Sequence, residues 1–177
     1  MNKWNSSVLA LLLFAHAAAA YNDQDVVNFS VSGNITQSIC SVTVPGRVDL
    51  GVYARQDLAF AGAHSANIPF TINLTGCTQG LTRATVTFTG MPYDDGSWGS
   101  VIYANQADAG AQGIGLQIYN ADGASPVNLA NGVSYTFPVD AQTAGGNLTL
   151  IARLYSPEGK STAGEFSSAV TLNFIYN

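Results

Sequence analysis

Few side chains in this sequence of 177 residues could take part in chemistry, and its two cysteines, Cys40 and Cys77, come first. In an exported protein, an even number of cysteines most simply forms a disulfide bond, and two free thiols are the alternative. A structural zinc site needs four ligands, and beyond the first 20 residues the sequence has a single histidine, His64. We therefore expect a disulfide between Cys40 and Cys77 and no metal site.

The candidate catalytic residues are His64 and the neighbouring acids Asp94 and Asp95. A catalytic histidine needs a nucleophile and an orienting acid, and the stretch around His64, "AGAHSAN", points to neither. Paired carboxylates could hydrolyse glycosides, but adjacent acids before a glycine are more typical of a turn. The glycine-rich "GAQGIG" lacks the strand–turn–helix context of a dinucleotide site. We expect no catalytic residue, no cofactor and no enzyme activity.

Three aromatic residues, Trp98, Tyr93 and Tyr103, could form a surface on which sugars stack. Such rings also bring a large apolar area to a core or a loop. Packing inside the domain is the interpretation that we prefer.

The first residues have the pattern of a secretory signal peptide. Lys3 precedes the apolar run "VLALLLFAHAAAA", which ends in small residues and is too short to span a bilayer. Cleavage after Ala17 or after Ala20 fits the pattern, and we prefer Ala20. The remaining length suits one domain.

The composition indicates an all-β domain without an electrostatic partner. Charged residues make up 10% of the chain and the formal net charge is −5, so no basic patch for nucleic acid is expected. Stretches of alternating polar and apolar residues, separated by turn signals, predict β-strands in a sandwich or barrel. Pro138 predicts an edge strand or a bulge. The predicted strands are 68–76, 84–90 and 147–155, with shorter ones at 40–44, 47–52, 100–104, 114–119 and 133–139.

Both ends of the mature chain alternate in the same way. The segment 25–36, "DVVNFSVSGNIT", and the segment 164–177, "GEFSSAVTLNFIYN", each place apolar residues on one face, and the second is interrupted by Ser168. In an ordinary sandwich, these two strands could pair with each other.

Taken together, these features resemble the pilin subunits of chaperone–usher pili (type 1 and P fimbriae) of Gram-negative bacteria. The resemblance rests on the signal peptide, on Gly33 in the extension before the first cysteine, and on the cysteine pair. It continues through "GIGLQIY" and "LTLIARLY" to Gly164, fourteenth from the end, and the penultimate Tyr176. It covers essentially the whole chain.

The resemblance implies an incomplete immunoglobulin-like β-sandwich that lacks its last (G) strand. It divides the chain into a signal peptide (1–20), a donor-strand extension (21–36) and a pilin domain (37–177). A strand of a periplasmic chaperone, and later the extension of the neighbouring pilin subunit, would complete the sandwich, with an outer-membrane usher as a further partner. The implied donor residues are Val27, Phe29, Val31, Gly33 and Ile35. The implied groove-facing residues are Gly164, Phe166, Val170, Leu172, Phe174 and Tyr176.

The implied function is that of a structural subunit, of the minor or adaptor type, in a fimbria on the bacterial surface. It would polymerise by donor-strand exchange and support adhesion. One alternative is a binding module like a tip adhesin, although such adhesins usually carry a separate lectin domain and lack a donor extension. The other alternative is an ordinary secreted immunoglobulin-like domain whose own ends pair.

Overall fold

The computed structural model describes residues 32, 39–94, 96–120 and 126–177. The chain divides into two units, Met1–Ile35 and Thr36–Asn177, and the elements below belong to the second. The expected signal peptide and the implied donor residues Val27, Phe29, Val31, Gly33 and Ile35 lie outside the described residues. Within the described ranges, no helix has the length and apolar character needed to cross a membrane.

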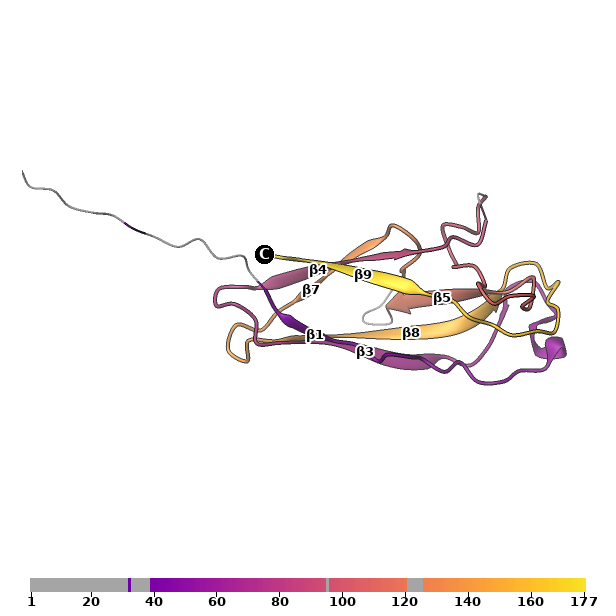
Figure 1. Cartoon of the computed structure of the whole chain (residues 1–177), viewed down its shortest axis with the longest axis horizontal. Helices are drawn as coiled ribbons and strands as arrows, with labels where there is room; N and C mark the ends of the chain where they lie inside the picture. Colours follow the sequence, from indigo (N-terminus) through magenta and orange to yellow (C-terminus); the bar gives the residue numbers. More distant parts are fainter. Residues whose placement is uncertain (1–31, 33–38, 95, 121–125) are drawn as a thin grey trace, which may run out of the picture. The chain divides into compact units, whose positions relative to one another are not determined.

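Two antiparallel sheets form the two layers of the domain (Figure 1). The first sheet has the order β1 (Ser41–Thr43), β3 (Ile68–Thr75), β8 (Gly146–Ser156), β5 (Gly115–Asn120) and β6 (Val127–Asn128), and β2 (Ala63–His64) also pairs with β8. The second has the order β7 (Ser134–Pro138), β4 (Arg83–Gly90) and β9 (Val170–Tyr176). One short 3-10 helix, η1 (Arg55–Leu58), lies between β1 and β2. The predicted all-β class is confirmed.

The core lies between the two sheets and follows the alternation of their strands. Ile72 of β3 and Leu150 of β8 reach it from the first sheet, and Val86 and Phe88 of β4 reach it from the second; each is fully buried. Tyr103 is also fully buried, and its hydroxyl donates a hydrogen bond of 2.7 Å to the carbonyl of Leu129. This burial raises the pKa of Tyr103 well above the ordinary value.

The predicted disulfide is confirmed. It joins Cys40, immediately before β1, to Cys77, which follows β3. The two strands pair in the register Ser41↔Thr75 and Val42↔Leu74. The bond therefore anchors the first strand of the domain to its neighbour in the sheet.

Strand β7 confirms the interpretation of Pro138. It lies at the edge of the second sheet and ends at that proline. Because proline has no backbone N–H, it is tolerated where no further strand needs that donor.

The strand predicted at 47–52 is wrong. The N–H of Gly51 donates to the Asp49 carboxylate at 2.9 Å, and Gly51 has a φ of +86°. This local side-chain bond turns the chain and competes with strand pairing. The apolar residues of the segment, Val48 and Leu50, nevertheless pack against the core.

The strand predicted at 100–104 is also wrong. The N–H groups of Val101 and Ile102 both donate to the carbonyl of Trp98 at 2.9 Å, which makes a turn. Ile102 and Tyr103 are adjacent and both fully buried, so no alternation exists there. The three aromatic residues do not form a common surface on which a sugar could stack. The Tyr103 side chain is buried in the core, and the Trp98 ring packs against the Tyr155 ring, with centroids 5.8 Å apart.

Two of the candidate catalytic residues, His64 and Asp94, make structural hydrogen bonds, and Asp95 lies outside the described residues. His64 lies in β2, and its Nδ1 contacts the carbonyl of Ser65 at 2.8 Å. The Asp94 carboxylate accepts hydrogen bonds from the N–H groups of Gly96 and Gly99, as expected for a turn. Among the residues that the structure describes, no group of three or more His, Cys, Asp or Glu side chains could hold a metal ion.

Candidate functional site at the open edge of strand β9

Strand β9 is the last strand of its sheet and has one neighbour. It pairs antiparallel with β4 from Ala84↔Tyr176 to Gly90↔Val170. Within the described part of the chain, no strand pairs with its other edge. Among the described residues, β9 is therefore paired along one of its two edges.

The backbone of β9 presents hydrogen-bonding groups to the open side. Arg83 and Asn177 exchange two N–H···O=C bonds of 3.0 Å each, so this pair is a hydrogen-bonded one. Such pairs recur at every second residue of an antiparallel ladder. The N–H and C=O groups that point away from β4 therefore belong to Val170, Leu172, Phe174 and Tyr176.

The side chains of the same four residues point inward and pack against the core, but they remain half-buried. The residues between them face solvent, and the Ile175 side chain is 62% exposed. The rings of Phe174 and Tyr176 stack, with centroids 6.2 Å apart, and partial burial raises the pKa of Tyr176. The inward face of β9 thus lacks a complete cover.

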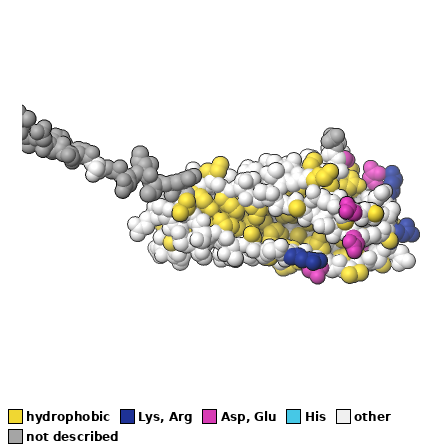
Figure 2. All heavy atoms as spheres, viewed as in Figure 1, with side chains coloured by type: hydrophobic (Ala, Val, Ile, Leu, Met, Phe, Trp, Pro, Cys, Tyr) yellow, Lys and Arg dark blue, Asp and Glu magenta, His cyan; other side chains and the backbone are white. Residues whose placement is uncertain are grey.

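Half-buried apolar side chains of the first sheet and its connections continue this surface. Figure 2 shows hydrophobic side chains in a band along the molecule between β9 and the strands β1 and β3, with charged side chains gathered toward one end. We call the set of half-buried residues that pack against the core here the apolar band. Its members are Cys40, Val48, Leu50, Phe70, Phe166, Val170, Leu172, Phe174 and Tyr176.

The residues before β9 do not form the long strand that the alternation predicted. The N–H groups of Ser167 and Ala169 donate to the side-chain oxygens of Asn105 and Gln106 at 2.9 and 2.7 Å. The N–H of Gln106 donates back to the carbonyl of Ser167 at 2.6 Å. These bonds hold the segment against a loop, so β9 begins at Val170 rather than near Gly164.

Gly164 therefore lies outside β9, in this connecting segment. Its φ is +155°, and a Cβ atom there would lie 2.5 Å from the nitrogen of Ala111 and 2.8 Å from the carbonyl carbon of Gly110. The close approach of two backbones is what requires a glycine. Phe166 of the same segment does join the apolar band.

The sequence reasoning missed the opposite side of this site. Val48 and Leu50 fall in the strand predicted at 47–52 and Phe70 in the strand predicted at 68–76, and neither pattern indicates that these side chains stay partly exposed. Their alternation was visible in the sequence, but their incomplete cover was not, since it depends on which strands meet in space.

The chemistry available here is recognition and not catalysis. An edge strand with a free row of backbone groups and an uncovered apolar face is a template for another strand. Pairing of this kind, β-augmentation, supplies main-chain hydrogen bonds and places alternate side chains in apolar positions.

Comparison with known proteins points in the same direction. A family model described as fimbrial protein matches residues 29–177. The chain is 36% identical over 160 residues to the S-fimbrial adhesin protein SfaS of Escherichia coli O6:K15:H31, covering 89% of this chain and 90% of SfaS. It is 30% identical over 178 residues to protein FimG of Escherichia coli K12, covering 99% of each chain. The minor fimbrial subunit HifD of Haemophilus influenzae is 28% identical over 181 residues, which cover 96% of this chain and 82% of HifD.

Solved structures show the same fold. The P pilus rod subunit PapA matches with a TM-score of 0.60 at 19% identity, covering 78% of this chain and 99% of PapA. A subunit of a chaperone–usher pilus matches with a TM-score of 0.62 at 17% identity, covering 87% of this chain and 97% of that one. The fold is therefore the incomplete immunoglobulin-like sandwich that the family resemblance implies.

Proposed function

The chain belongs to the fimbrial protein family, and from this premise we propose that the open edge of β9 receives a strand from a partner. The protein is an exported structural subunit of a chaperone–usher fimbria on the bacterial surface. The first partner is a periplasmic chaperone, and the second is a neighbouring subunit, with exchange taking place at an outer-membrane usher. The protein has no enzymatic role in this proposal.

One observation carries the proposal. The inward side chains of β9 are half-buried and its backbone groups point to the same open side. A single inserted strand would pair with those groups and cover the apolar band. Left open, the same edge is an aggregation hazard, which is the physical reason for a chaperone.

The strand offered to the next subunit is the extension 21–36, with Val27, Phe29, Val31 and Ile35 as its apolar residues. At about 1.5–3 kcal/mol for each side chain that is fully buried, the four together contribute on the order of 10 kcal/mol. The stability of a whole small domain is about 5–15 kcal/mol, so a joint of this kind can persist without a covalent bond. Gly33 would lie where the neighbour's backbone leaves no room for a side chain.

The subunit is of the minor or adaptor type in this proposal, and it supports adhesion as part of the fimbria. The support is the likeness to relatives that are named as an adhesin protein and as a minor fimbrial subunit. Mass spectrometry of sheared fimbriae would test this point. A copy number far below that of the most abundant subunit is expected, and equal or greater abundance would contradict it.

The open edge of β9 can be tested with two adjacent residues on opposite faces. Phe174→Asp places a charge in the apolar band, whereas Ile175→Asp places the same charge on the solvent face. Both variants are co-expressed with the periplasmic chaperone and purified as complexes. We expect Phe174→Asp to abolish the complex and Ile175→Asp to leave it intact; equal recovery of the two would refute the site.

The donor role of the extension needs a separate test. Purified chaperone–subunit complex is mixed with a peptide of residues 25–36, and release of the chaperone is followed by native mass spectrometry. A Gly33→Leu peptide should exchange much more slowly, because overpacking costs about 1–3 kcal/mol, while a Ser32→Leu peptide serves as the control. If deletion of residues 23–35 from the subunit destroys its chaperone complex, the extension belongs to its own fold and the proposal fails.

A further inference from the structure

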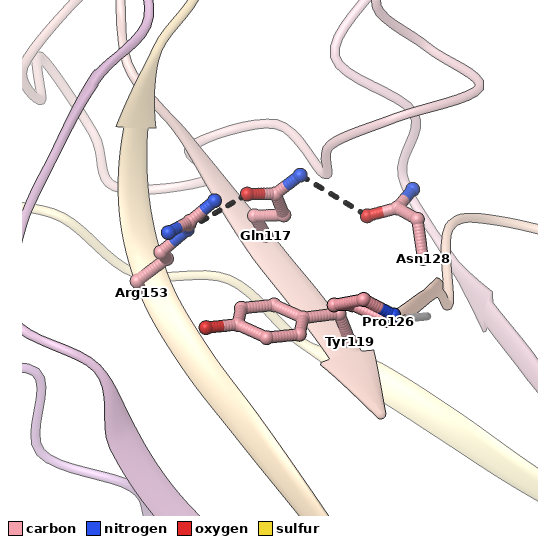
Figure 3. A pocket seen from close by; sticks show the side chains of 5 residues that line it. All are labelled: Gln117, Tyr119, Pro126, Asn128 and Arg153. Atoms are coloured by element: carbon pink, nitrogen blue, oxygen red, sulfur yellow. Dashed lines mark hydrogen bonds between the residues drawn. The ribbon is translucent and has the colours of Figure 1, made fainter. Parts of the chain in front are cut away.

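A hollow lies on the solvent face of the first sheet, away from the apolar band. It has a volume of about 280 Å³ and is lined by Gln117 and Tyr119 of β5, Pro126, Asn128 of β6 and Arg153 of β8. Figure 3 shows the two amide side chains on one side, Tyr119 and Pro126 on the other, and Arg153 toward one end. The hollow therefore has one polar wall and one apolar wall.

Arg153 carries a positive charge that no carboxylate neutralises within the described residues. Its Nε–H donates to the Gln117 side-chain oxygen at 2.8 Å, and its Nη1 donates to the Asn67 side-chain oxygen at 3.5 Å. Its guanidinium carbon lies 5.0 Å from the centroid of the Tyr119 ring. Among the described residues, the single ion pair joins Lys160 to Glu158 and does not include Arg153. The Arg153 guanidinium carbon also lies 6.0 Å from the centroid of the Tyr155 ring, so the partners of Arg153 are neutral amides and two aromatic rings.

The polar wall is held in position before any ligand arrives. The Gln117 amide N–H donates to the Asn128 side-chain oxygen at 3.2 Å, and the Asn128 amide N–H donates to the carbonyl of Val101 at 2.9 Å. This chain of bonds connects the guanidinium to the backbone through two amides. Groups that are already ordered lose less entropy when they bind a ligand.

We propose that this hollow binds one saccharide residue that carries a carboxylate. Its volume lies just below the range of about 300–1,000 Å³ for small-molecule sites, which suits a single sugar ring rather than a larger ligand. The planar guanidinium matches the geometry of a carboxylate. Gln117 and Asn128 supply donors and acceptors for ring hydroxyls, and the flat faces of Tyr119 and Pro126 suit the C–H face of a sugar.

The hollow lies away from the open edge of β9. Strands β5 and β6 are at the edge of the first sheet opposite β1, whereas the apolar band lies between β1 and β9. The side chains of Gln117 and Arg153 alternate with the core residues Leu116 and Ala152, so they face solvent. Occupation of the β9 edge by a partner strand therefore leaves the hollow open, and the inference does not depend on that proposal.

The test is saturation-transfer NMR on the mature protein as purified from the periplasm, together with any chaperone that co-purifies with it. The probes are glucuronic acid and galacturonic acid, with glucose as the neutral sugar and acetate as the carboxylate without a sugar. We expect transfer to the ring protons of at least one sugar acid, weaker transfer to glucose, and at least a tenfold loss of affinity in Arg153→Gln. Arg83→Gln, the same change at an exposed position of the other sheet, should bind as the wild type does.

Tyr119→Ala supplies a second variant if Arg153→Gln does not fold, as judged by circular dichroism, and it should also weaken binding. Three results would overturn the inference. The first is the absence of saturation transfer to both sugar acids. The second is that the wild type and the folded variant bind the sugar acid with equal affinity. The third is that acetate, at equal concentration, displaces the sugar acid. The last result would indicate an anion site without a saccharide.

Discussion

Strands β4 and β9 are neighbours in one sheet, and their side chains alternate in the same way, but they are covered to different extents. The inward residues of β4, Ala84, Val86 and Phe88, are fully buried. The inward residues of β9 pack against the same core and remain half-buried. Both strands are antiparallel and similar in length. What differs is the number of neighbours, since β4 has two and β9 has one.

The comparison separates the direction of a side chain from its burial. Alternation decides which face of a strand points to the core, whereas a second neighbour decides whether that face is sealed. The other edge strand of the sheet, β7, makes the contrast sharper. It is short and ends at Pro138, which cannot donate to a further strand, whereas β9 has no such protection. An open edge of this kind is suited to a partner.

The largest effect on stability should come from replacing Phe88 of β4 or Phe174 of β9 with alanine, one in each of two variants. Phe88→Ala should lower the free energy of unfolding by about 3–5 kcal/mol, as expected for a fully buried ring. Phe174→Ala should cost less in the chain alone and more once a peptide of residues 25–36 is bound, because the peptide completes the burial of Phe174. Urea unfolding with and without the peptide measures both. Equal costs without the peptide would mean that β9 is as well covered as β4.

Removal of the disulfide should have the next largest effect. The bond links residues 37 apart in sequence, and closing a loop of this length stabilises the folded chain by about 3–4 kcal/mol. Cys40→Ser should lower stability by that amount and release β1, which borders the apolar band opposite β9. A Cys40→Ser, Cys77→Ser double variant controls for the unpaired thiol. Titration of free thiols in the native wild-type protein would contradict the prediction.

A smaller effect on stability is expected from a change at Tyr103. This side chain is fully buried in the core, whereas the inward side chains of β9 are half-buried. Tyr103→Phe leaves the carbonyl of Leu129 without its donor and should cost about 1–3 kcal/mol at neutral pH.

The pH dependence of the same residue gives a second measurement. Burial raises the pKa of Tyr103 in the folded chain, and a tyrosine in the unfolded chain ionises near pH 10. Its contribution is therefore complete below about pH 10 and is lost as the pH rises toward the folded-state pKa. Unfolding of the wild type between pH 9 and 11 (about one unit on either side of that value) should show this loss, and Tyr103→Phe should show less of it. Identical slopes would show that Tyr103 is not sealed.

The smallest effect should come from the outer face of β4. The hydroxyls of Thr85 and Thr136 lie 2.8 Å apart on that face, and cross-strand pairs of this kind contribute about 0.2–1 kcal/mol. Thr85→Ala should cost no more than that, and the peptide should not change the cost. A change that depended on the peptide would mean that the outer face also responds to the β9 edge.

Local chemistry in the sequence was sufficient for much of this fold. Alternation located β3, β4, β5, β7 and β8 to within two residues, and it identified the inward residues of β9. Pro138 indicated an edge because the missing N–H is a property of the residue itself. The cysteine count predicted the disulfide. These features depend on one residue or on a period of two, so they can be read without the rest of the molecule.

Other features were decided by tertiary structure. Asn105 and Gln106 hold the residues before Val170 in a loop. The free edge of β9 follows from the order of strands in the sheet, and the hollow at Arg153 joins residues of β5, β6 and β8. Each depends on contacts between segments far apart in the chain, and the pairing of strands across such distances is not encoded in the period of any one of them.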